Sequence, residues 1–200
     1  MFVSTLNQKA LAWLKSQRRS FAGRDVVVGF SGSFATELML IRLGVDGGGP
    51  KAIHGHDVSL FSYAFGEYLS GVDHIDARPR DDAPDWLKRA WGPGARGVAV
   101  LHVMLDMLAY VKQNNPHAVR MWAGYVDQFS MLVDRTEESA LTMPRQLDTF
   151  SLGSVSDHFA AHDDPGAVFI FQAPATVAMY DRLLNAMDPF FEWTPPAHKL

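Results

Sequence analysis

A glycine-bearing turn and a later carboxylate are the first residues whose types and spacing suggest chemistry. Gly29 and Gly32 lie in GFSGSF, between a valine run and a helical pattern. Asp57 follows after about 25 residues, near the offset of roughly 20 at which an acidic residue meets ribose hydroxyls in nucleotide-binding βαβ units. The glycine spacing does not match the GxGxxG fingerprint. Two interpretations stay open: a nucleoside site, or a tight turn with Asp57 as the cap of a helix beginning at Val58.

Two pairs of histidines are the other candidates for chemistry. His54 and His56 alternate along a predicted strand, so both imidazoles share one face, as metal ligands require. His158 and His162 lie four residues apart on a short helix that we expect to be exposed. The neighbouring sequence supplies no third ligand to either pair. We therefore predict hydrogen-bonded lining residues and no metal site.

Two strand-then-helix units must position the turn and the carboxylate. Val26 to Val28 predicts a strand buried on both faces, and a helix follows from about Phe34 to Leu43. Lys51 to His56 predicts a second strand, and Val58 to Leu69 a second helix. Successive units of this kind favour a parallel sheet. An amphipathic helix over residues 4 to 19, with Trp13 on its apolar face, precedes them.

The rest of the chain predicts a helical insertion and then a return to alternating strands and helices. Residues from Asp85 to about Met143 show helical patterns without a strand signal. The last third then predicts a strand, a short helix, a strand and a helix in DTFSLG, VSDHFAAH, AVFIFQAP and TVAMYDRLLNAM. The fold class is therefore a doubly wound α/β domain over residues 1–200, with a helical insertion at about 83–143.

Composition and charge limit the kinds of site, partner and cellular location that we expect for the protein. The 200 residues are 48% hydrophobic, carry a net charge of −4 and include no cysteine, which excludes disulfides and thiolate metal sites. No run approaches the roughly 20 apolar residues that a membrane span needs. We expect no membrane partner and a cytoplasmic protein. Nucleic acid would meet local basic clusters, which are Lys15, Arg18 and Arg19, and then Arg78, Arg80, Lys88 and Arg89.

Three segments carry a resemblance to a known family. FSGSFATELMLIRLG, IHGHDVSLFSYAFGEYLSG and the stretch from TFSLGSVSDHF to FFEWTPP resemble the phage-type antirestriction DNA adenine methyltransferases. The likeness runs from about Asp25 to Pro196. It implies a Rossmann-like, mostly parallel methyltransferase sheet and S-adenosylmethionine as cofactor. It also implies a bacteriophage origin, which would place the protein in the cytoplasm of a host cell.

The resemblance implies roles for particular residues. Phe30, Ser31, Gly32 and Ser33 match the loop that contacts the methionine part of the cofactor, and Asp57 matches the acidic residue on the ribose. Ser154 stands where related enzymes have a carboxylate on the adenine side. The catalytic motif of the family is a polar residue, two prolines and an aromatic. Here it reads Gln172, Ala173, Pro174 and Ala175, so only Gln172 and Pro174 are retained as catalytic candidates.

Two functions therefore stay open. In the first, the protein methylates adenine in DNA, and Gln172 and Pro174 receive the amino group of the flipped base. In the second, it is a cofactor-binding or DNA-binding relative that has lost methyl transfer, because the first proline and the aromatic are missing. DNA is the expected partner of an active enzyme. Target recognition would fall to the helical insertion, to a second copy of the chain or to a partner subunit.

Overall fold

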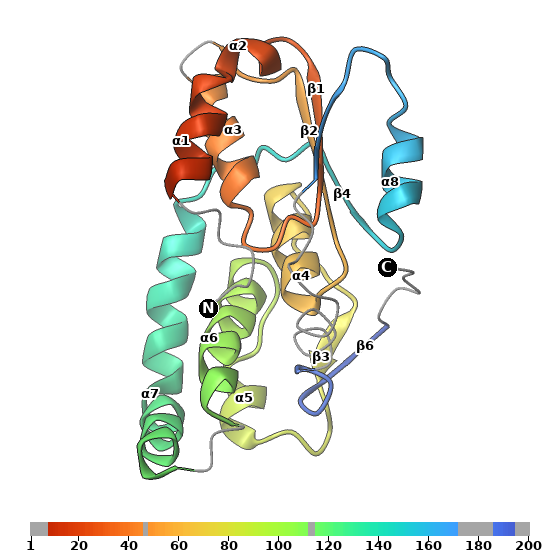
Figure 1. Cartoon of the computed structure of the whole chain (residues 1–200). Coiled ribbons are helices and arrows are strands. Elements are labelled where there is room, and N and C mark those ends of the chain that lie inside the picture. Colours follow the sequence, from red (N-terminus) through yellow and green to blue (C-terminus); the bar gives the residue numbers. More distant parts are fainter. Residues whose placement is uncertain (1–7, 46–47, 112–114, 172–185, 195–200) are drawn as a thin grey trace.

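A four-stranded parallel sheet organises the molecule. The computed structural model describes residues 8–45, 48–111, 115–171 and 186–194. The strands are β1 (Asp25–Gly29), β2 (Ala52–Asp57), β4 (Thr149–Leu152) and β5 (Val168–Phe171), and they lie in the order β4-β2-β1-β5. All three neighbouring pairs are parallel. The predicted mostly parallel, Rossmann-like α/β fold is confirmed (Figure 1).

The three consecutive valines of β1 explain why this segment forms a buried strand. Val26, Val27 and Val28 are each 0% exposed, so both faces of β1 are covered. β-branched side chains suit a pleated strand, and a continuous apolar run is typical of a parallel strand with helices on both sides. The prediction of a strand buried on both faces is confirmed.

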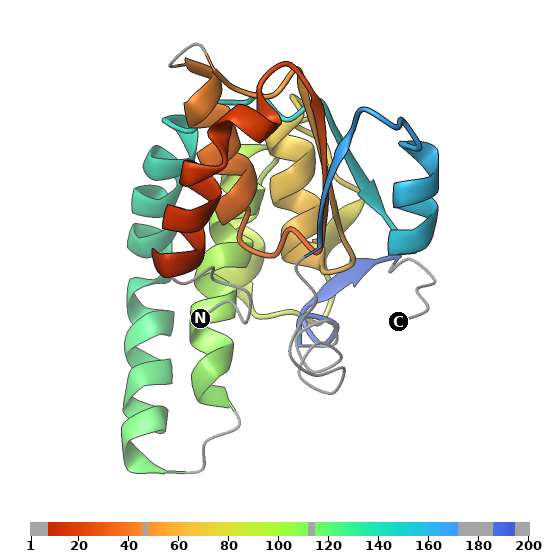
Figure 2. The same ribbon diagram turned by 45° about the horizontal axis from the view of Figure 1, so that its top comes forward.

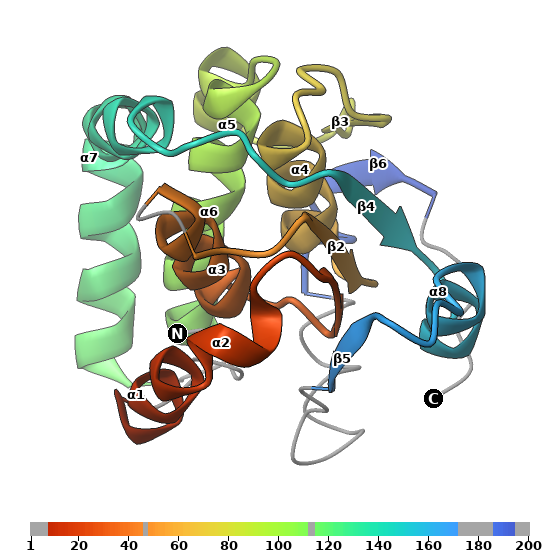
Figure 3. The same ribbon diagram turned by 90° about the horizontal axis from the view of Figure 1, so that it is seen from above.

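The two faces of the sheet are covered unequally. Helices α3 (Ala35–Val45) and α4 (Leu60–Leu69) contact β2 on one face, and α8 (Val155–Ala161) packs against β1 and β2 on the other. Figure 3 shows α8 across the sheet from α3 and α4. The chain enters this fold through α1 (Gln8–Ser16) and α2 (Arg18–Phe21).

The N-terminal helix differs from its prediction. Helix α1 ends at Ser16, and the separate short helix α2 follows, instead of one helix through residue 19. Trp13 is 63% exposed, whereas its neighbour Leu14 is 4% exposed and joins the core. The helix therefore docks through Leu14, and the placement of Trp13 on the buried face was wrong.

Gly29 and Gly66 permit close packing on opposite faces of the sheet. A Cβ atom on Gly29 would lie 2.8 Å from Val155 Cγ2 and 2.9 Å from Phe159 Cζ, both on α8. A Cβ atom on Gly66 of α4 would overlap the ring of Phe150 on β4. Since real Cβ atoms do not approach so closely, glycine at each position sets the distance between helix and sheet.

The segment between β2 and β4 is mainly helical. It contains α5 (Asp85–Ala90), α6 (Ala95–Val111) and α7 (Pro116–Leu141). Asn115 caps α7 by accepting a hydrogen bond from the Ala118 amide, and Pro116 occupies its first turn. Helices α6 and α7 lie side by side along the molecule (Figure 2). Arg96 of α6 pairs with Asp134 and Glu137 of α7.

A small antiparallel ribbon was not predicted. Strand β3 (Ala77–Pro79) pairs with β6 (Phe191–Trp193), which brings together segments more than a hundred positions apart. Phe191 is 2% exposed and its ring lies 5.1 Å from that of Trp91. Because these aromatic residues belong to the packed ribbon, they are structural.

Candidate functional site

The strand order reverses between β1 and β5. The chain passes from β1 to β2 and on to β4 in one direction, and then returns to place β5 on the other side of β1. In open α/β sheets, ligands bind outside the carboxyl ends of the strands where the order reverses in this way. Phe30 follows β1, and Phe171 ends β5. Their rings meet edge to face, with centroids 5.3 Å apart.

The turn between β1 and α3, residues Phe30 to Phe34, has an unusual backbone. Phe30 has a φ of 63°, Gly32 of 55° and Phe34 of 59°. Residues other than glycine rarely occupy this region, and such strain often accumulates at functional sites. Phe34 is 0% exposed, and its ring contacts those of Phe65 and Phe150. This packing holds the turn in its strained shape.

Hydrogen bonds from the second unit clamp the β1–α3 turn. The Gly32 amide donates to Asp57 Oδ2 at 2.7 Å, and the Ser62 hydroxyl donates to the Gly32 carbonyl at 3.1 Å. The Ser31 amide donates to the His56 carbonyl, and the His56 amide donates back to Ser31 Oγ. Both backbone groups of Gly32 are therefore tied to the β2–α4 segment.

Asp57 acts on this turn from a buried position. Its side chain is 1% exposed, and besides Gly32 it accepts hydrogen bonds from the amides of Val58 and Ser59. The cap of α4 is Ser59, whose Oγ accepts from the Ser62 amide, so the interpretation of Asp57 as the helix cap was wrong. In this structure the carboxylate organises the backbone, and its contact with a ribose stays a prediction.

Glu37 is a second buried carboxyl beside the turn, and the sequence analysis missed it. It lies in the first turn of α3 and is 0% exposed. Burial raises the pKa of Glu37 to about 7, the nearby charge of Asp57 acts in the same direction, and Ser31 opposes them. Within the described residues, neither carboxyl oxygen has a hydrogen-bond partner of good geometry. A burial-driven shift of this kind is a common mark of functional sites.

A cavity of about 420 Å³ opens beside the turn at Ser33. Its walls are mainly apolar and aromatic, and the cavity lies among α3, α4, α6 and α7. Arg135 and His102 add groups that can carry positive charge. The residues that line the cavity include Ser33, Phe61, Phe65, His102 and Arg135. Such a lining suits a small ligand with an apolar body and a negative end.

The four histidines of the two predicted pairs form one cluster. The ring of His54 stacks on that of His162 with centroids 4.0 Å apart, and His56 stacks on His158 at 5.1 Å. His158 is 4% exposed, although most other residues of α8 are exposed as expected. The pairing follows from the packing of α8 over β2, which neither local pattern reveals. Within the described ranges, no group of three such side chains is placed to hold a metal ion.

Burial favours the uncharged imidazole at three of the four histidines. His56 Nε2 bonds to the Gly153 carbonyl, and His158 Nδ1 to Ser151 Oγ. Burial lowers the pKa of His158 to about 3, and the neighbouring His56, His162 and His54 add to this effect. Burial also lowers the pKa values of His56 and His54. Four imidazoles can stack this closely only while most of them are uncharged.

A family model describing "Phage DNA Adenine Methylase-like domain 1" matches residues 2–200. The chain belongs to this family. The resemblance inferred from the sequence is therefore confirmed. The comparisons with curated proteins and with solved structures found no match.

The remaining predicted site residues of this phage DNA adenine methylase-like protein are Ser31, Ser33, Ser154, Gln172 and Pro174. Ser154 caps α8 at the carboxyl end of β4, where its Oγ accepts from the Asp157 amide. Gln172 and Pro174 lie outside the described residues. Ser31 is 2% exposed and belongs to the clamp, whereas Ser33 is partly exposed and faces the cavity.

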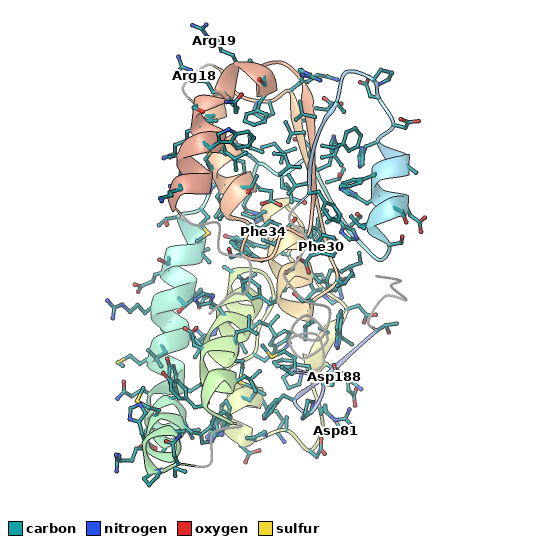
Figure 4. All side chains as sticks on the ribbon, viewed as in Figure 1. Arg18, Arg19, Phe30, Phe34, Asp81 and Asp188 are labelled. Carbon is teal, nitrogen blue, oxygen red and sulfur yellow. The ribbon has the colours of Figure 1, made fainter. Side chains whose placement is uncertain are left out.

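The two basic clusters of this methylase-like domain have different surroundings. Arg18 and Arg19 lie at the far end of the sheet from Phe30 and Phe34 (Figure 4). In the second cluster, Arg78 pairs with Glu192, Arg80 with Asp82 and Lys88 with Asp85. The flanking Trp86 packs on Phe129, and Trp91 packs on Phe191. No helix within the described residues is long and apolar enough to cross a membrane.

Proposed function

We propose that the protein binds S-adenosylmethionine at the carboxyl ends of β1 and β2 and methylates adenine in DNA. One observation carries the proposal: in a member of a DNA adenine methylase-like family, the strained β1–α3 turn lies at the reversal of strand order. Methylation of phage DNA would protect it from host restriction. The antirestriction role in the host cytoplasm belongs to this proposal.

The residues present fit the methionine part of the cofactor. The cavity at Ser33 offers an apolar volume beside the turn, and the guanidinium of Arg135 can pair with the methionine carboxylate. The N-terminal end of α3 adds a favourable dipole for the same anion. The ribose side is different, because the carboxylate of Asp57 already accepts three backbone amides. We assign Asp57 the role of setting the shape of the turn, with ribose contact requiring a local rearrangement.

The cofactor and the residues of the chain would have different roles in methyl transfer. When bound, S-adenosylmethionine supplies the electrophilic methyl group. The side-chain oxygen of Gln172 would accept a hydrogen bond from the amino group of a flipped adenine, and Pro174 would limit the motion of that segment. Holding the amino group in this way directs its lone pair toward the methyl group. Ser154 would lie on the adenine side of the cofactor.

A non-catalytic protein on the same scaffold is the second candidate. The sequence Gln172-Ala173-Pro174-Ala175 favours it, because the first proline and the aromatic of the methyltransferase motif are absent. Such a protein would keep the turn, the clamp and the cavity, since these depend on β1, β2 and their helices. It would bind the cofactor or DNA without transferring a methyl group.

Two measurements test the proposal in order. Isothermal titration calorimetry with S-adenosylmethionine should show binding, and absence of heat at millimolar cofactor with a folded protein would remove the cofactor assignment. Transfer of radiolabelled methyl groups to unmodified DNA should then be detected and should fall strongly in Gln172→Ala with cofactor binding retained. Cofactor binding without any transfer would instead support the non-catalytic candidate.

A further inference from the structure

An exposed aromatic platform lies at the end of β5. Phe169 and Phe171 alternate along this strand, so both side chains project from the same face of the sheet. They are 43% and 58% exposed, although large aromatic side chains are usually buried. The ring of Phe159 on α8 contacts both of them, with centroids at 5.3 and 6.1 Å.

Phe171, unlike Phe169, lies at the carboxyl end of β5. It ends β5 and pairs in register with Gly29, the last residue of β1. Its ring meets the ring of Phe30 edge to face at 5.3 Å, whereas Phe169 lies two residues nearer the amino end of the strand. Because Gly29 has no side chain, Val155 and Phe159 of α8 lie over the end of β1. Phe171 therefore lies where the strand order reverses.

We propose that Phe171 is the platform on which the target base of DNA stacks. Rings of nucleobases stack on exposed aromatic side chains, and this contact does not depend on base identity. The aromatic residue expected after Pro174 is absent, since residue 175 is alanine. In the sequence, Phe171 immediately precedes Gln172, the residue proposed to hold the adenine amine. This inference rests on the proposed function, because DNA is taken as the partner.

Phe30 gives the platform its rigidity. It is 5% exposed and is held by the strained β1–α3 turn. An edge-to-face contact with a fixed ring orients Phe171 and leaves a face of its ring available. The same contact would link the cofactor loop to the stacked base. A movement of the β1–α3 turn would displace Phe30 and so change the orientation of Phe171.

The test compares single-stranded probes that differ by one base. An 11-nucleotide strand of abasic residues with one central adenine is measured against a fully abasic strand of equal charge, by fluorescence anisotropy at low salt. Equal charge removes the backbone contribution from the comparison. Wild-type protein should prefer the adenine-containing strand by about fivefold to a hundredfold, as expected for one stacked base.

Four variants separate stacking from packing. Phe171→Ala and Phe171→Leu should both abolish the preference, although leucine keeps an apolar contact with Phe30. Phe171→Trp should retain it. Phe169→Ala is the matched control, since it also removes a contact with Phe159, and it should leave the preference unchanged. Circular dichroism establishes that each variant is folded.

The outcomes distinguish this inference from the proposed function. No preference in the wild type, or an equal preference in Phe171→Leu, would overturn the platform. Loss of S-adenosylmethionine binding in Phe171→Leu would also overturn it, because Phe171 would then contact the cofactor. Failure of wild-type protein to bind the cofactor, with the base preference intact, would contradict the proposed function alone.

Discussion

The amide of Gly32 donates a 2.7 Å hydrogen bond to the carboxylate of Asp57. This bond joins the turn after β1 to the end of β2, and it makes the predicted cofactor loop and the predicted acidic residue one structural unit. A charge-assisted bond to a buried carboxylate is stronger than a neutral one. The shape of the loop therefore depends on a residue from the neighbouring strand.

Replacing Asp57 should affect both the fold and the cofactor. Asp57→Asn puts an amide group where three backbone N–H groups point, so we expect a loss of about 2–4 kcal/mol in unfolding free energy. Affinity for S-adenosylmethionine should fall at least tenfold. Urea unfolding and calorimetry measure the two effects.

Asp148→Asn is the matched control for this change. Its carboxylate accepts a hydrogen bond from the Ile53 amide at 2.8 Å, at the opposite end of β2. Because Asp148 is exposed and accepts this one bond, we expect a smaller loss of stability and an unchanged affinity for the cofactor. Equal loss of affinity in both variants would mean that Asp57 acts only through general stability.

Glu37 should make the protein less stable at alkaline pH. The unfolded chain releases this proton near pH 4.5, whereas burial raises the folded pKa to about 7. Stability from this group is therefore fully present below about pH 4.5 and is lost as the pH rises to about 7. Glu37→Gln should gain up to about 3 kcal/mol relative to wild type at pH 8. Denaturant unfolding between pH 4 and 8 measures it, with the exposed Glu138→Gln as control.

The histidine cluster should act in the opposite direction. The folded pKa of His158 is about 3, below its ordinary value of 6.5, so the unfolded chain takes up a proton first as the pH falls. Its contribution to stability is full above about pH 6.5 and is lost progressively toward pH 3. His158→Phe should flatten this acid-side slope, whereas replacement of the exposed His74 should not. An unchanged slope in His158→Phe would contradict the lowered pKa of His158.

Arg135 should discriminate between ligands with and without a carboxylate. If its guanidinium pairs with the methionine end, Arg135→Gln should weaken binding of S-adenosylmethionine by up to about fivefold, as expected for a solvated ion pair. Binding of 5′-methylthioadenosine, which lacks that carboxylate, should be unchanged. Arg120→Gln, an exposed change on the same helix, is the control. Equal weakening of both ligands would contradict the pairing.

Local patterns were sufficient for the main elements of the sheet. The three consecutive valines of β1 and the Asn115–Pro116 start of α7 carry their structural meaning within a few residues. The β3–β6 ribbon was missed because its strands have three residues each and gain their stability from a distant partner. Short strands of this kind have no periodicity long enough to detect.

The site was predictable only in part, for the same reason. The proximity of Gly32 and Asp57 follows from two adjacent parallel strands that end at one edge of the sheet. The burial of Glu37 and the meeting of His56 with His158 depend on how α3 and α8 dock on that sheet. The exposure of Phe171 is a property of the assembled β5 edge, and a hydrophobic strand pattern by itself predicts the opposite.

The β1–α3 turn and the histidine cluster both depend on the absence of a side chain at Gly29. Even one methyl group there would push Val155 and Phe159 outward, and α8 would carry His158 away from His56 as it moved. Phe159 would also draw away from Phe171. A single hydrogen atom in place of a side chain thus sets the spacing between the end of β1 and α8, two regions separated by more than a hundred positions.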